Sequence, residues 1–316
     1  MRLTLRQLQY FVAAVNAGSI TRAAAQLHVA ATALSLQIKA IEDQFGVELL
    51  SRHSRGIALT ALGAAFAEQA RVILAQVSTT ESLLQSGDGG MPRTIRIGAP
   101  PAVLRLIGTD AVIGAAGRFP GVNIEVFEGW SSELETRLRQ GSLDVVVGYG
   151  LTSDEALYAV QLHDDAFYFV GAPTVVGPAA PISLTAALAS DLVFYGTDSV
   201  GWRASCEAAQ RAGLPLPREH HVGSIDVWRA MLCRGIACTI GSFAAVAEEY
   251  GRGELVLRPI VGHPIHRYIG ISFRREDMDI RWPTDFTNYV RDLIQQAFSD
   301  LDLRSPFPVA PFLPAS

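Results

Sequence analysis

The sequence has little cysteine, with three in 316 residues. Small secreted domains held by disulfides carry many more, so a disulfide scaffold is excluded and a reducing, cytoplasmic setting is expected. The sequence also has no apolar run long enough to span a membrane, and no cleavable apolar leader is recognisable at its start. We therefore expect a cytoplasmic protein with no membrane partner.

The short motifs of the common enzyme classes are also missing. There is no Gly-x-Ser-x-Gly nucleophile elbow and no phosphate-binding loop. Gly148-Tyr149-Gly150 lacks the third glycine of a dinucleotide fingerprint. We expect that the protein is not an enzyme and carries no cofactor.

Candidate metal and redox residues are few. His220-His221 and the pair His263 and His266 lack a third ligand at a familiar spacing, so no metal site is expected. Cys233 and Cys238 fall at a predicted helix end and in a predicted buried strand, where a thiol is usually an inert apolar residue. A redox-responsive role for these two cysteines is kept as an alternative.

Positive charge is scarce overall but is enriched at the start of the chain. Residues 1–60 hold six Lys or Arg against three Asp or Glu, a balance of +3, which leaves −8 for the remainder of a chain of net charge −5. The acidic total argues against a nonspecific nucleic-acid coat, whereas the modestly basic head allows local binding to phosphate.

The first sixty residues carry a helix-turn-helix pattern. Apolar residues recur at steps of three and four from Leu5 to Val15, which predicts an amphipathic helix that Gly18 ends. Ser19 can cap a short second helix, because its hydroxyl can accept a bond from a free backbone N–H. A third helix is the candidate for the major groove. It is predicted to run to about residue 45 with four side chains inward: Leu34, Ile38, Ile41 and Phe45.

A basic turn follows the third helix. Residues 49–50 and 57–59 are predicted as two short strands. The turn between them holds Arg52, His53 and Arg55, which makes a wing beside the helix-turn-helix. Its two arginines can bind phosphate.

With this order of elements, residues 3–62 resemble the winged helix-turn-helix of LysR-type transcriptional regulators. The remaining chain is similar in length and layout to the effector-binding region of that family. The resemblance implies a DNA-binding transcription regulator that binds a double-stranded operator and responds to a small-molecule effector. The matching positions are Leu8, Tyr10, Phe11, Gly18, Ser19, Ala23, Ala24, Leu27, Leu34, Ser35, Ile38, Glu42, Gly46, Leu49, Arg52, Leu59, Thr60 and Gly63.

The third helix departs from the family pattern. Where the family commonly has Ser-Gln at the start of this helix and Arg after the serine, this chain has Ala30-Ala31 and Leu36. Gln and Arg can each supply about 1–3 kcal/mol of base discrimination, whereas Ala and Leu offer apolar contact alone. The residues expected to contact DNA are Ser19, Arg22, Ala31, Thr32, Ser35, Gln37, Lys39, Arg52 and Arg55.

A long helix is predicted after the head, from a cap at Thr60 to about Gln85. Alternating four- and three-residue steps give it a coiled-coil seam, which predicts a homodimer that can pair further into a tetramer. The alternative is an amphipathic helix packed on its own domain. The Gly- and Pro-containing residues 87–92 read as a hinge. The seam residues are Phe66, Ala70, Ile73, Val77, Thr80 and Leu84.

After the hinge the pattern alternates between strand and helix, and 49% hydrophobic content is enough to fill the cores. The first strands, near 94–98, 122–127 and 143–148, predict a βαβαβ unit with a parallel sheet. A second α/β unit follows, and a strand near 268–273 with a helix from 283 to 298 returns to the first. The strands of the second unit are predicted near 166–171, 192–195, 220–223, 238–240 and 255–259, and its helices near 202–212, 224–234 and 243–250. This layout resembles the two-lobed periplasmic-binding-protein fold of LysR-type sensors.

The expected fold class is therefore α/β with an N-terminal winged helix-turn-helix and a long linker helix. The predicted divisions are a DNA-binding domain at 1–60, a linker helix at 61–86, a hinge at 87–92, an effector-binding domain at 93–304 and an irregular tail at 305–316. Within the effector-binding domain, lobe 1 takes about 93–162 and 267–304, and lobe 2 takes about 163–266.

Ligands of such folds lie beyond the carboxyl ends of the strands, where helices begin. The residues expected to bind the effector are Pro101, Ala102, Ser131, Tyr149, Thr197, Ser199 and Trp202. The resemblance to the family supports Ala102, Ser131, Tyr149 and Thr197 in particular. The same strand ends also hold Ala99, Pro100, Trp130, Ser132, Tyr195, Asp198 and Ser224.

Each of these residues has a structural alternative, because a loop serine can simply cap a helix and a proline can simply set its start. Helix N-termini favour a small anion, whereas the neighbouring aromatic side chains favour an aromatic or neutral compound. The identity of the effector stays open, as does a regulator that works without one.

Overall fold

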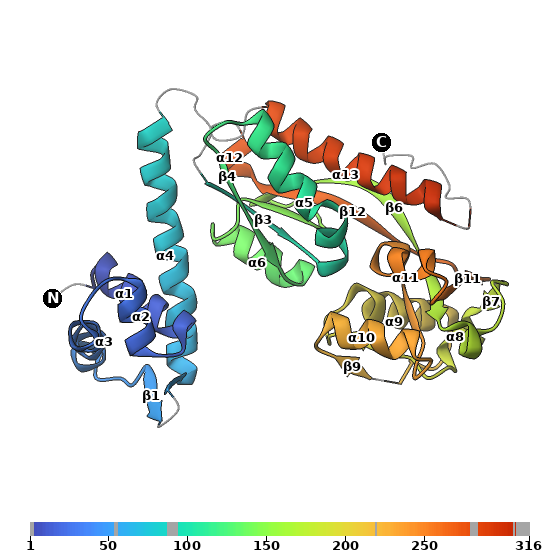
Figure 1. Ribbon diagram of the computed structural model, residues 1–316, viewed down its shortest axis with the longest axis horizontal. Helices are drawn as coiled ribbons and strands as arrows, with labels where there is room; N and C mark the ends of the chain where they lie inside the picture. The colour runs from blue at the N-terminus through green and yellow to red at the C-terminus, as the bar shows by residue number, and fades with distance from the viewer. Residues whose placement is uncertain are drawn as a thin grey trace. The chain divides into compact units, whose positions relative to one another are not determined.

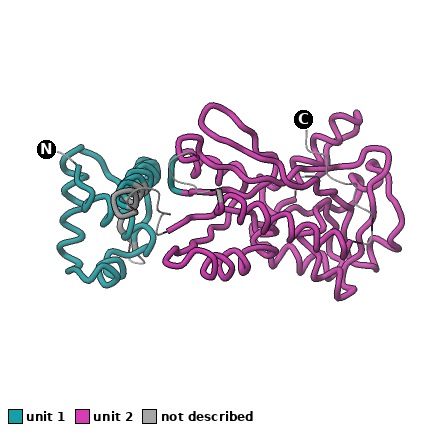
Figure 2. Tube along the Cα trace, turned by 90° about the horizontal axis from the view of Figure 1, so that it is seen from above, with its two compact units in different colours: residues 1–90, 140–142 teal, residues 91–139, 143–316 magenta. Residues whose placement is uncertain are grey.

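The computed structural model describes residues 3–53, 56–86, 94–218, 220–278, 284–305 and 307. The predicted hinge at 87–92 and most of the predicted tail lie outside these residues. The chain divides into two compact units, residues 1–90 with 140–142 and residues 91–139 with 143–316 (Figure 2). None of the helices within the described ranges has the length and apolar character of a membrane span.

The first unit is a winged helix-turn-helix with a long helix attached. Gln7 and Thr4 form a capping box at its start, and Gly18 ends the first helix in the left-handed conformation with φ +60°. The predicted N-cap Ser19 accepts a hydrogen bond from Arg22 N. The elements are α1 (Leu5–Ala17), α2 (Ile20–Gln26), α3 (Ala31–Phe45), β1 (Leu50–His53), β2 (Gly56–Leu59) and α4 (Ala61–Ser86).

The core of the head confirms three of the four inward positions expected on α3. Leu34, Ile38 and Ile41 are buried, whereas Phe45 is 55% exposed, so its predicted inward position was wrong. Phe45 is the last residue of the helix before Gly46 turns the chain away, and it extends beyond the helices that cover the other three.

The start of the long helix α4 packs on the head. Thr60 Oγ1 accepts from Gly63 N at 2.9 Å, and a Cβ at Gly63 would lie 1.9 Å from the Leu49 carbonyl oxygen. Ala70 is fully buried, and the Phe66 ring contacts Phe11 with centroids 4.9 Å apart. Phe66 and Ala70, two residues of the predicted dimer seam, therefore pack within their own unit. This packing agrees with the alternative of an amphipathic helix packed on its own domain.

The second unit consists of two α/β lobes (Figure 1). The first lobe and the returning segments comprise β3 (Thr94–Ala99), α5 (Pro101–Arg118), β4 (Asn123–Glu128), α6 (Ser131–Arg139), β5 (Val145–Tyr149), β6 (Leu157–Gly171), β12 (Ile265–Arg274), α12 (Arg275–Met278) and α13 (Thr284–Arg304). The second lobe comprises α7 (Pro173–Val176), β7 (Ile182–Ser183), α8 (Leu184–Leu188), β8 (Phe194–Tyr195), α9 (Val200–Ala212), β9 (His221–Val222), α10 (Ile225–Cys233), β10 (Thr239–Ser242), η1 (Phe243–Ala245), α11 (Ala247–Gly251) and β11 (Val256–Val261).

The sheet is mixed rather than wholly parallel. β3 pairs in parallel with β4 and β5, as expected for a βαβαβ unit. β12 is antiparallel to both β5 and β6, and its pairing with β6 extends over ten residue pairs. These two long strands run together between the lobes (Figure 1).

The second lobe differs from the prediction in its short elements. The helix expected over residues 243–250 is interrupted at Val246, whose φ of −135° is incompatible with helix, so that η1 and α11 are separate. The short elements α7, β7 and α8 were not predicted. β8 and β9 form a parallel pair of their own, and β10 and β11 both pair with β6.

Candidate functional site

The outward face of α3 carries the candidate base-contacting residues. Thr32 and Lys39 are exposed and Ser35 is half-buried between them. Leu36 lies on the same face with 66% of its surface exposed. An exposed leucine on this face can contact a thymine methyl group but cannot form a hydrogen bond to a base.

The other predicted contacts occupy different positions. The Arg22 side chain is exposed at the start of α2, whereas Ala31 packs against the head core and Gln37 is half-buried. Arg52 lies in β1 but its side chain is not described, and Arg55 falls outside the described residues.

Acidic side chains lie close to Lys39 towards the far end of α3. A groove there brings Lys39 together with Glu42, Asp43 and Glu48. Glu42 Oε1 accepts from Leu49 N at 2.8 Å and from the next backbone N–H at 3.1 Å, so this carboxylate holds the start of the wing.

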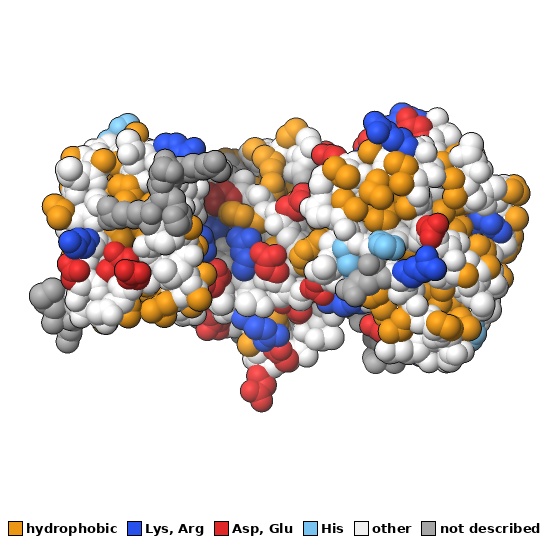
Figure 3. Space-filling view, turned by 90° about the horizontal axis from the view of Figure 1, so that it is seen from below, with side chains coloured by type: hydrophobic (Ala, Val, Ile, Leu, Met, Phe, Trp, Pro, Cys, Tyr) orange, Lys and Arg blue, Asp and Glu red, His pale blue; other side chains and the backbone are white. Residues whose placement is uncertain are grey.

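On the face of the second unit seen in Figure 3, acidic and basic side chains are interspersed rather than gathered by sign.

The second unit contains a cavity between its two lobes, with an empty volume of about 650 Å³ that includes its open mouth. This size is suitable for a small organic molecule. The starts of α5, α6, α9 and α10 all reach it. Its wall is formed by Pro100, Pro101, Ala102, Trp130, Ser131, Tyr149, Phe167, Phe194, Tyr195, Asp198, Ser199, Val200, Gly201, Arg203, Ile225, Trp228, Thr239, Ile240, Gly241, Ser242 and Ala245.

The inner end of the cavity is a hydrogen-bonded arrangement around Tyr149. Ser131 Oγ accepts from Tyr149 N at 3.2 Å, and a Cβ at Gly148 would lie 2.9 Å from that oxygen. The Tyr149 hydroxyl donates to Asp165 Oδ2 at 2.7 Å. Burial raises the pKa of Asp165 to about 7, although hydrogen bonds from Tyr149 and Ser242 act in the opposite direction. Burial and the Asp165 charge raise the pKa of Tyr149 well above its ordinary value.

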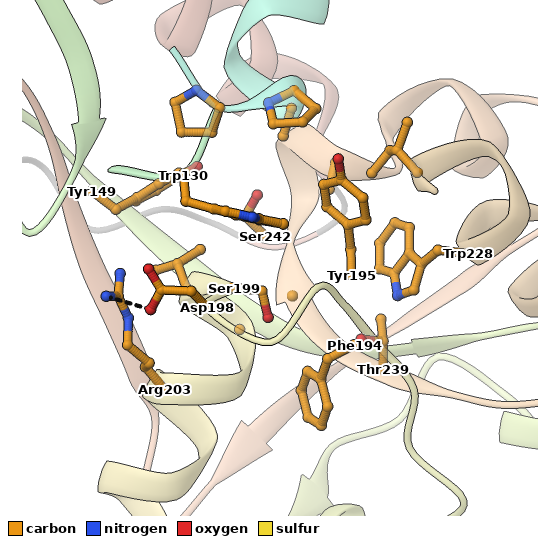
Figure 4. Close-up of a pocket in the computed structure, with 18 of the residues that line it drawn as sticks. Trp130, Tyr149, Phe194, Tyr195, Asp198, Ser199, Arg203, Trp228, Thr239 and Ser242 are labelled. Atoms are coloured by element: carbon orange, nitrogen blue, oxygen red, sulfur yellow. Dashed lines mark hydrogen bonds and ion pairs between the residues drawn. The ribbon is translucent and has the colours of Figure 1, made fainter. Parts of the chain in front are cut away.

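Aromatic side chains surround the rest of the cavity (Figure 4). Trp130 of the first lobe contacts Tyr195 of the second, with ring centroids 4.6 Å apart. The Trp228 indole N–H donates to the Val193 carbonyl at 3.1 Å, so this ring presents apolar surface to the cavity. Such a wall favours a ligand with an apolar, ring-shaped body.

Among the described lining residues, charge at the cavity is limited to one ion pair. Arg203 Nη1 lies 3.0 Å from Asp198 Oδ1, as the dashed line in Figure 4 marks. The Ser132 hydroxyl, on the other lobe, donates to the second oxygen of the same carboxylate. Asp198 therefore links the starts of α6 and α9 across the cavity mouth, and the Arg203 guanidinium is already paired.

Comparison with known proteins identifies the architecture. The model of the LysR substrate binding domain matches residues 88–294, and that of the bacterial regulatory helix-turn-helix protein of the lysR family matches residues 5–64. The chain belongs to the LysR family. It is a LysR-type DNA-binding transcription regulator with an effector-binding domain, as the resemblance implied, and the family is one of transcriptional regulators.

Similar proteins extend over most of this LysR-type chain. The DNA-binding transcriptional dual regulator OxyR of Escherichia coli (strain K12) is 26% identical over 276 residues, 86% of this chain and 90% of OxyR. The nitrogen assimilation regulatory protein nac of Klebsiella aerogenes is 29% identical over 240 residues, 75% of this chain and 78% of its own. The crystal structure of CbnR, a LysR family regulator, shares the fold with a TM-score of 0.66 at 21% identity, covering 93% of this chain and 99% of CbnR.

Five of the seven effector residues predicted for this LysR-type regulator line the cavity. They are Pro101, Ala102, Ser131, Tyr149 and Ser199. Thr197 is exposed and is not among the lining residues. Trp202 packs edge-on against Phe194 and His221, at 5.3 and 5.1 Å between centroids, so it supports the wall from behind.

Ser199 and Ser224 also act as the helix caps that the alternative expected. Ser199 Oγ accepts from Trp202 N at 3.2 Å, and Ser224 Oγ accepts from Val227 N at 3.4 Å. A hydroxyl that accepts from the backbone keeps its proton to donate, so capping leaves Ser199 able to contact a ligand.

The lining residues that sequence reasoning missed include Phe167, Trp228, Thr239 and Ser242. Thr239 and Ser242 lie on β10, whose strand near 238–240 was predicted, so the strand-end rule could have found them. Phe167 lies within β6 and Trp228 within α10. No signal in the sequence distinguishes these two from ordinary core residues.

Cys233 and Cys238 are poorly suited to redox chemistry. Burial raises the pKa of the Cys238 thiol to about 11. Burial and the nearby Glu254 carboxylate raise that of Cys233, whose Sγ lies 3.7 Å from Glu254. Thiols react as thiolates, so both shifts reduce reactivity at neutral pH. Among the described residues, no group of three His, Cys, Asp or Glu is placed to hold a metal ion.

Proposed function

We propose that this regulator binds a two-fold operator through α3, α2 and the wing, and that a small molecule in the cavity between the lobes modulates it. The observation that carries the effector role is the cavity itself, because residues of both lobes line it and contact one another at its mouth. A ligand that prefers the closed arrangement shifts the population of lobe positions.

The proposed domain divisions are those set out from the sequence, with lobe 1 at about 93–162 and 267–304 and lobe 2 at about 163–266. Because its operator is DNA, we place the regulator in the cytoplasm. We also propose that it acts by binding alone, without catalysis. Ser131 and Ser199, two hydroxyls that line the cavity, accept backbone hydrogen bonds, and no histidine stands among the described lining residues to act as their base.

The proposed homodimer uses the exposed part of α4, which keeps Ile73 of the predicted seam and adds Leu62. Leu62 and Ile73 are 51% and 41% exposed and lie on one side of the helix, away from the buried Ala70. Exposed apolar residues repeated along a helix are the features of a helix pair. A dimer presents two copies of α3 to the half-sites of one operator, and pairing of dimers gives the proposed tetramer.

Relatives include proteins named as hydrogen peroxide-inducible genes activators. We do not extend a peroxide response to this chain, because the pKa values of Cys233 and Cys238 are both raised. The CbnR structure complexed with its target DNA has the same fold, which supports the operator as the partner proposed here.

Selection of genomic DNA fragments by the full chain, followed by sequencing, tests the operator proposal. We expect an enriched site with two-fold symmetry. Lys39→Ala should weaken binding to all DNA sequences. It should also lower the slope of log affinity against log salt concentration by about one, because one phosphate contact is lost. The Arg52→Ala, Arg55→Ala double variant should lower it by about two. Recovery of no enriched site would contradict the DNA-reading role.

A thermal-shift screen of metabolites against the full chain tests the effector proposal, because a bound ligand raises the melting temperature. The Trp130→Ala variant is the control, since it removes a wall of the cavity without touching the head. Compounds that raise the melting temperature of the wild-type protein and of Trp130→Ala equally bind outside the cavity. A screen in which no compound raises the melting temperature would contradict the effector role.

A further inference from the structure

A buried carboxyl lies directly behind the cavity. Asp165 is on β6, is 5% exposed and is not itself a lining residue. The hydroxyls that bond to it belong to two lining residues, Tyr149 at the end of β5 and Ser242 at the end of β10. We call Tyr149, Asp165 and Ser242 the floor cluster.

The floor cluster fixes the polarity of this end of the cavity. A hydroxyl has one proton to donate and lone pairs that accept. When Asp165 is ionised, it accepts the protons of Tyr149 and Ser242. The oxygen atoms of both hydroxyls are then left with lone pairs alone, so the cluster can accept hydrogen bonds from a ligand but cannot donate them.

No cation among the described residues neutralises Asp165. On its own strand, Asp164 lies 3.2 Å from His266 of β12, and Tyr168 is a neutral phenol. His163 is 3.6 Å from Asp302 of α13. Arg267 is the cross-strand neighbour of Asp165 on β12, but its guanidinium is 2.5 Å from Glu207. Within the described part of the chain, the Tyr149 and Ser242 hydroxyls are therefore the donors that balance negative charge at Asp165.

The described lining of the cavity offers no unpaired cation to hold an acid. The Arg203 guanidinium is paired with Asp198, and Lys, Arg and His are otherwise missing from the described lining. The aromatic rings of Trp130, Tyr195 and Trp228 leave an apolar space between the mouth and the floor cluster.

We propose that the cavity takes an effector with an apolar, ring-shaped body and a hydrogen-bond donor, an amine or a hydroxyl, directed at Tyr149 and Ser242, rather than a carboxylate. This inference rests on the proposed effector function and specifies its ligand class. Asp165 acts as a positioning residue, because it orients the two hydroxyls without touching the ligand.

The floor cluster also predicts how affinity changes with pH. A donor, above all an ammonium group, stabilises ionised Asp165, and the pKa of this carboxyl in the free protein is about 7. Affinity for such a ligand should therefore rise as the pH is raised from about 6 to about 8, since ionisation no longer has to be driven by binding.

Calorimetric titration of the full chain with benzylamine, benzyl alcohol and benzoate tests the ligand class, because these probes share a ring and differ in the head group. We expect benzylamine to bind most tightly, benzyl alcohol next and benzoate least. Asp165→Asn should weaken benzylamine binding by about tenfold, because a hydrogen bond oriented towards charge is lost.

The pH profile separates positioning from a structural effect. Benzylamine affinity should rise with pH in the wild-type protein and be flat in Asp165→Asn. Asp164→Asn is the matched control on the adjacent residue, and its profile should keep the rise with a midpoint at lower pH, since Asp164 adds to the raised pKa of Asp165.

Tightest binding by benzoate, a wild-type profile without pH dependence, or binding of none of the probes at millimolar concentration would each overturn the inference. The proposed function would survive those results if metabolites in the thermal-shift screen still stabilise the chain through Trp130. It would fail only if that screen yields no ligand.

Discussion

At the scale of single residues, Gly196 is required for two independent reasons. Its φ is +72°, a conformation that a side chain disfavours, and a Cβ there would lie 2.2 Å from Trp130 Cζ2. The glycine thus lets the indole of one lobe lie against the backbone of the other. This contact exists only when the lobes are as close as they are in this structure.

Gly196→Ala should therefore destabilise the second unit more than its backbone conformation alone requires. Gly213 provides the matched control, because its φ is +65° and nothing lies within 4 Å of the position of a Cβ. We expect about 1–2 kcal/mol for Gly213→Ala from the left-handed conformation, and at least about 1 kcal/mol more for Gly196→Ala from overpacking, measured by urea unfolding. Combining Gly196→Ala with Trp130→Ala should remove the additional destabilisation. Equal destabilisation by Gly196→Ala and Gly213→Ala would show that the Trp130 indole moves aside.

Asp165 gives stability a dependence on pH whose sign follows from its raised pKa. The folded carboxyl holds its proton up to about pH 7, whereas the unfolded one releases it near 3.8. The folded state binds more protons between these values, so the free energy of unfolding should fall as pH rises from about 4 to about 7, and then level off.

Asp165→Asn should remove this fall, so that the wild-type protein loses on the order of a few kcal/mol relative to the variant across the window. Urea unfolding at several pH values measures the difference. Contributions from Asp302 and His163, whose pKa values are raised and lowered respectively, are present in both proteins and cancel in the comparison. If the free energy of unfolding depends on pH in the same way in the wild-type protein and in Asp165→Asn, Asp165 is ionised throughout this range.

At the scale of elements, the head was predictable because each of its signals is local. Gly18, Ser19 and Gly46 mark the ends of helices whether or not the rest of the chain is considered. The requirement for Gly63 is different. A side chain at position 63 would collide with the Leu49 carbonyl oxygen, which lies at the other end of the wing. Only the structure reveals that contact.

The long strand β6 was recognised from the sequence only over residues 166–171. The polar run His163-Asp164-Asp165 comes directly before that segment and breaks its apolar pattern. In the structure these three side chains lie against Asp302, His266 and Tyr149, respectively, each from another element. Pairing over such distances in the sequence cannot be predicted from local pattern. For the same reason the floor cluster of Tyr149, Asp165 and Ser242 could not be predicted.

The helix α4 carries the prediction for oligomerisation. Ile73→Glu places a charge on the exposed apolar face of the helix, and we expect the protein to dissociate to monomers, because a charge is costly in a helix seam. Ala64→Glu is the control, since Ala64 is exposed on the opposite side. Sedimentation velocity measures the outcome. A dimer that survives Ile73→Glu would move the interface elsewhere.

At the scale of the whole effector-binding unit, contacts hold the lobes together on two sides of the cavity. Ser132 and Asp198 meet at the mouth. Arg105 of α5 reaches α11 of the other lobe, with Nε 3.1 Å from Glu248 Oε1 and Nη1 3.1 Å from Glu249 Oε1. The hydrogen bond from Arg105 lowers the pKa of Glu248, so this contact stays ionic at any physiological pH.

Arg105→Ala should shift the unit towards an open arrangement, because it removes the only described side chain of α5 that pairs with Glu248 and Glu249. A half-exposed pair of this kind contributes about 1 kcal/mol, which is about a fivefold change in the ratio of closed to open forms. Hydrogen exchange over residues 129–132 and 196–199, which meet across the mouth, should accelerate accordingly. Arg252→Ala is the matched control, since Arg252 lies 3.7 and 3.5 Å from the same two glutamates but within their own lobe. Acceleration in both variants would point to a general loosening of α11, whereas acceleration in Arg105→Ala alone would assign to this ion pair a share of the energy that an effector must supply to hold the lobes closed.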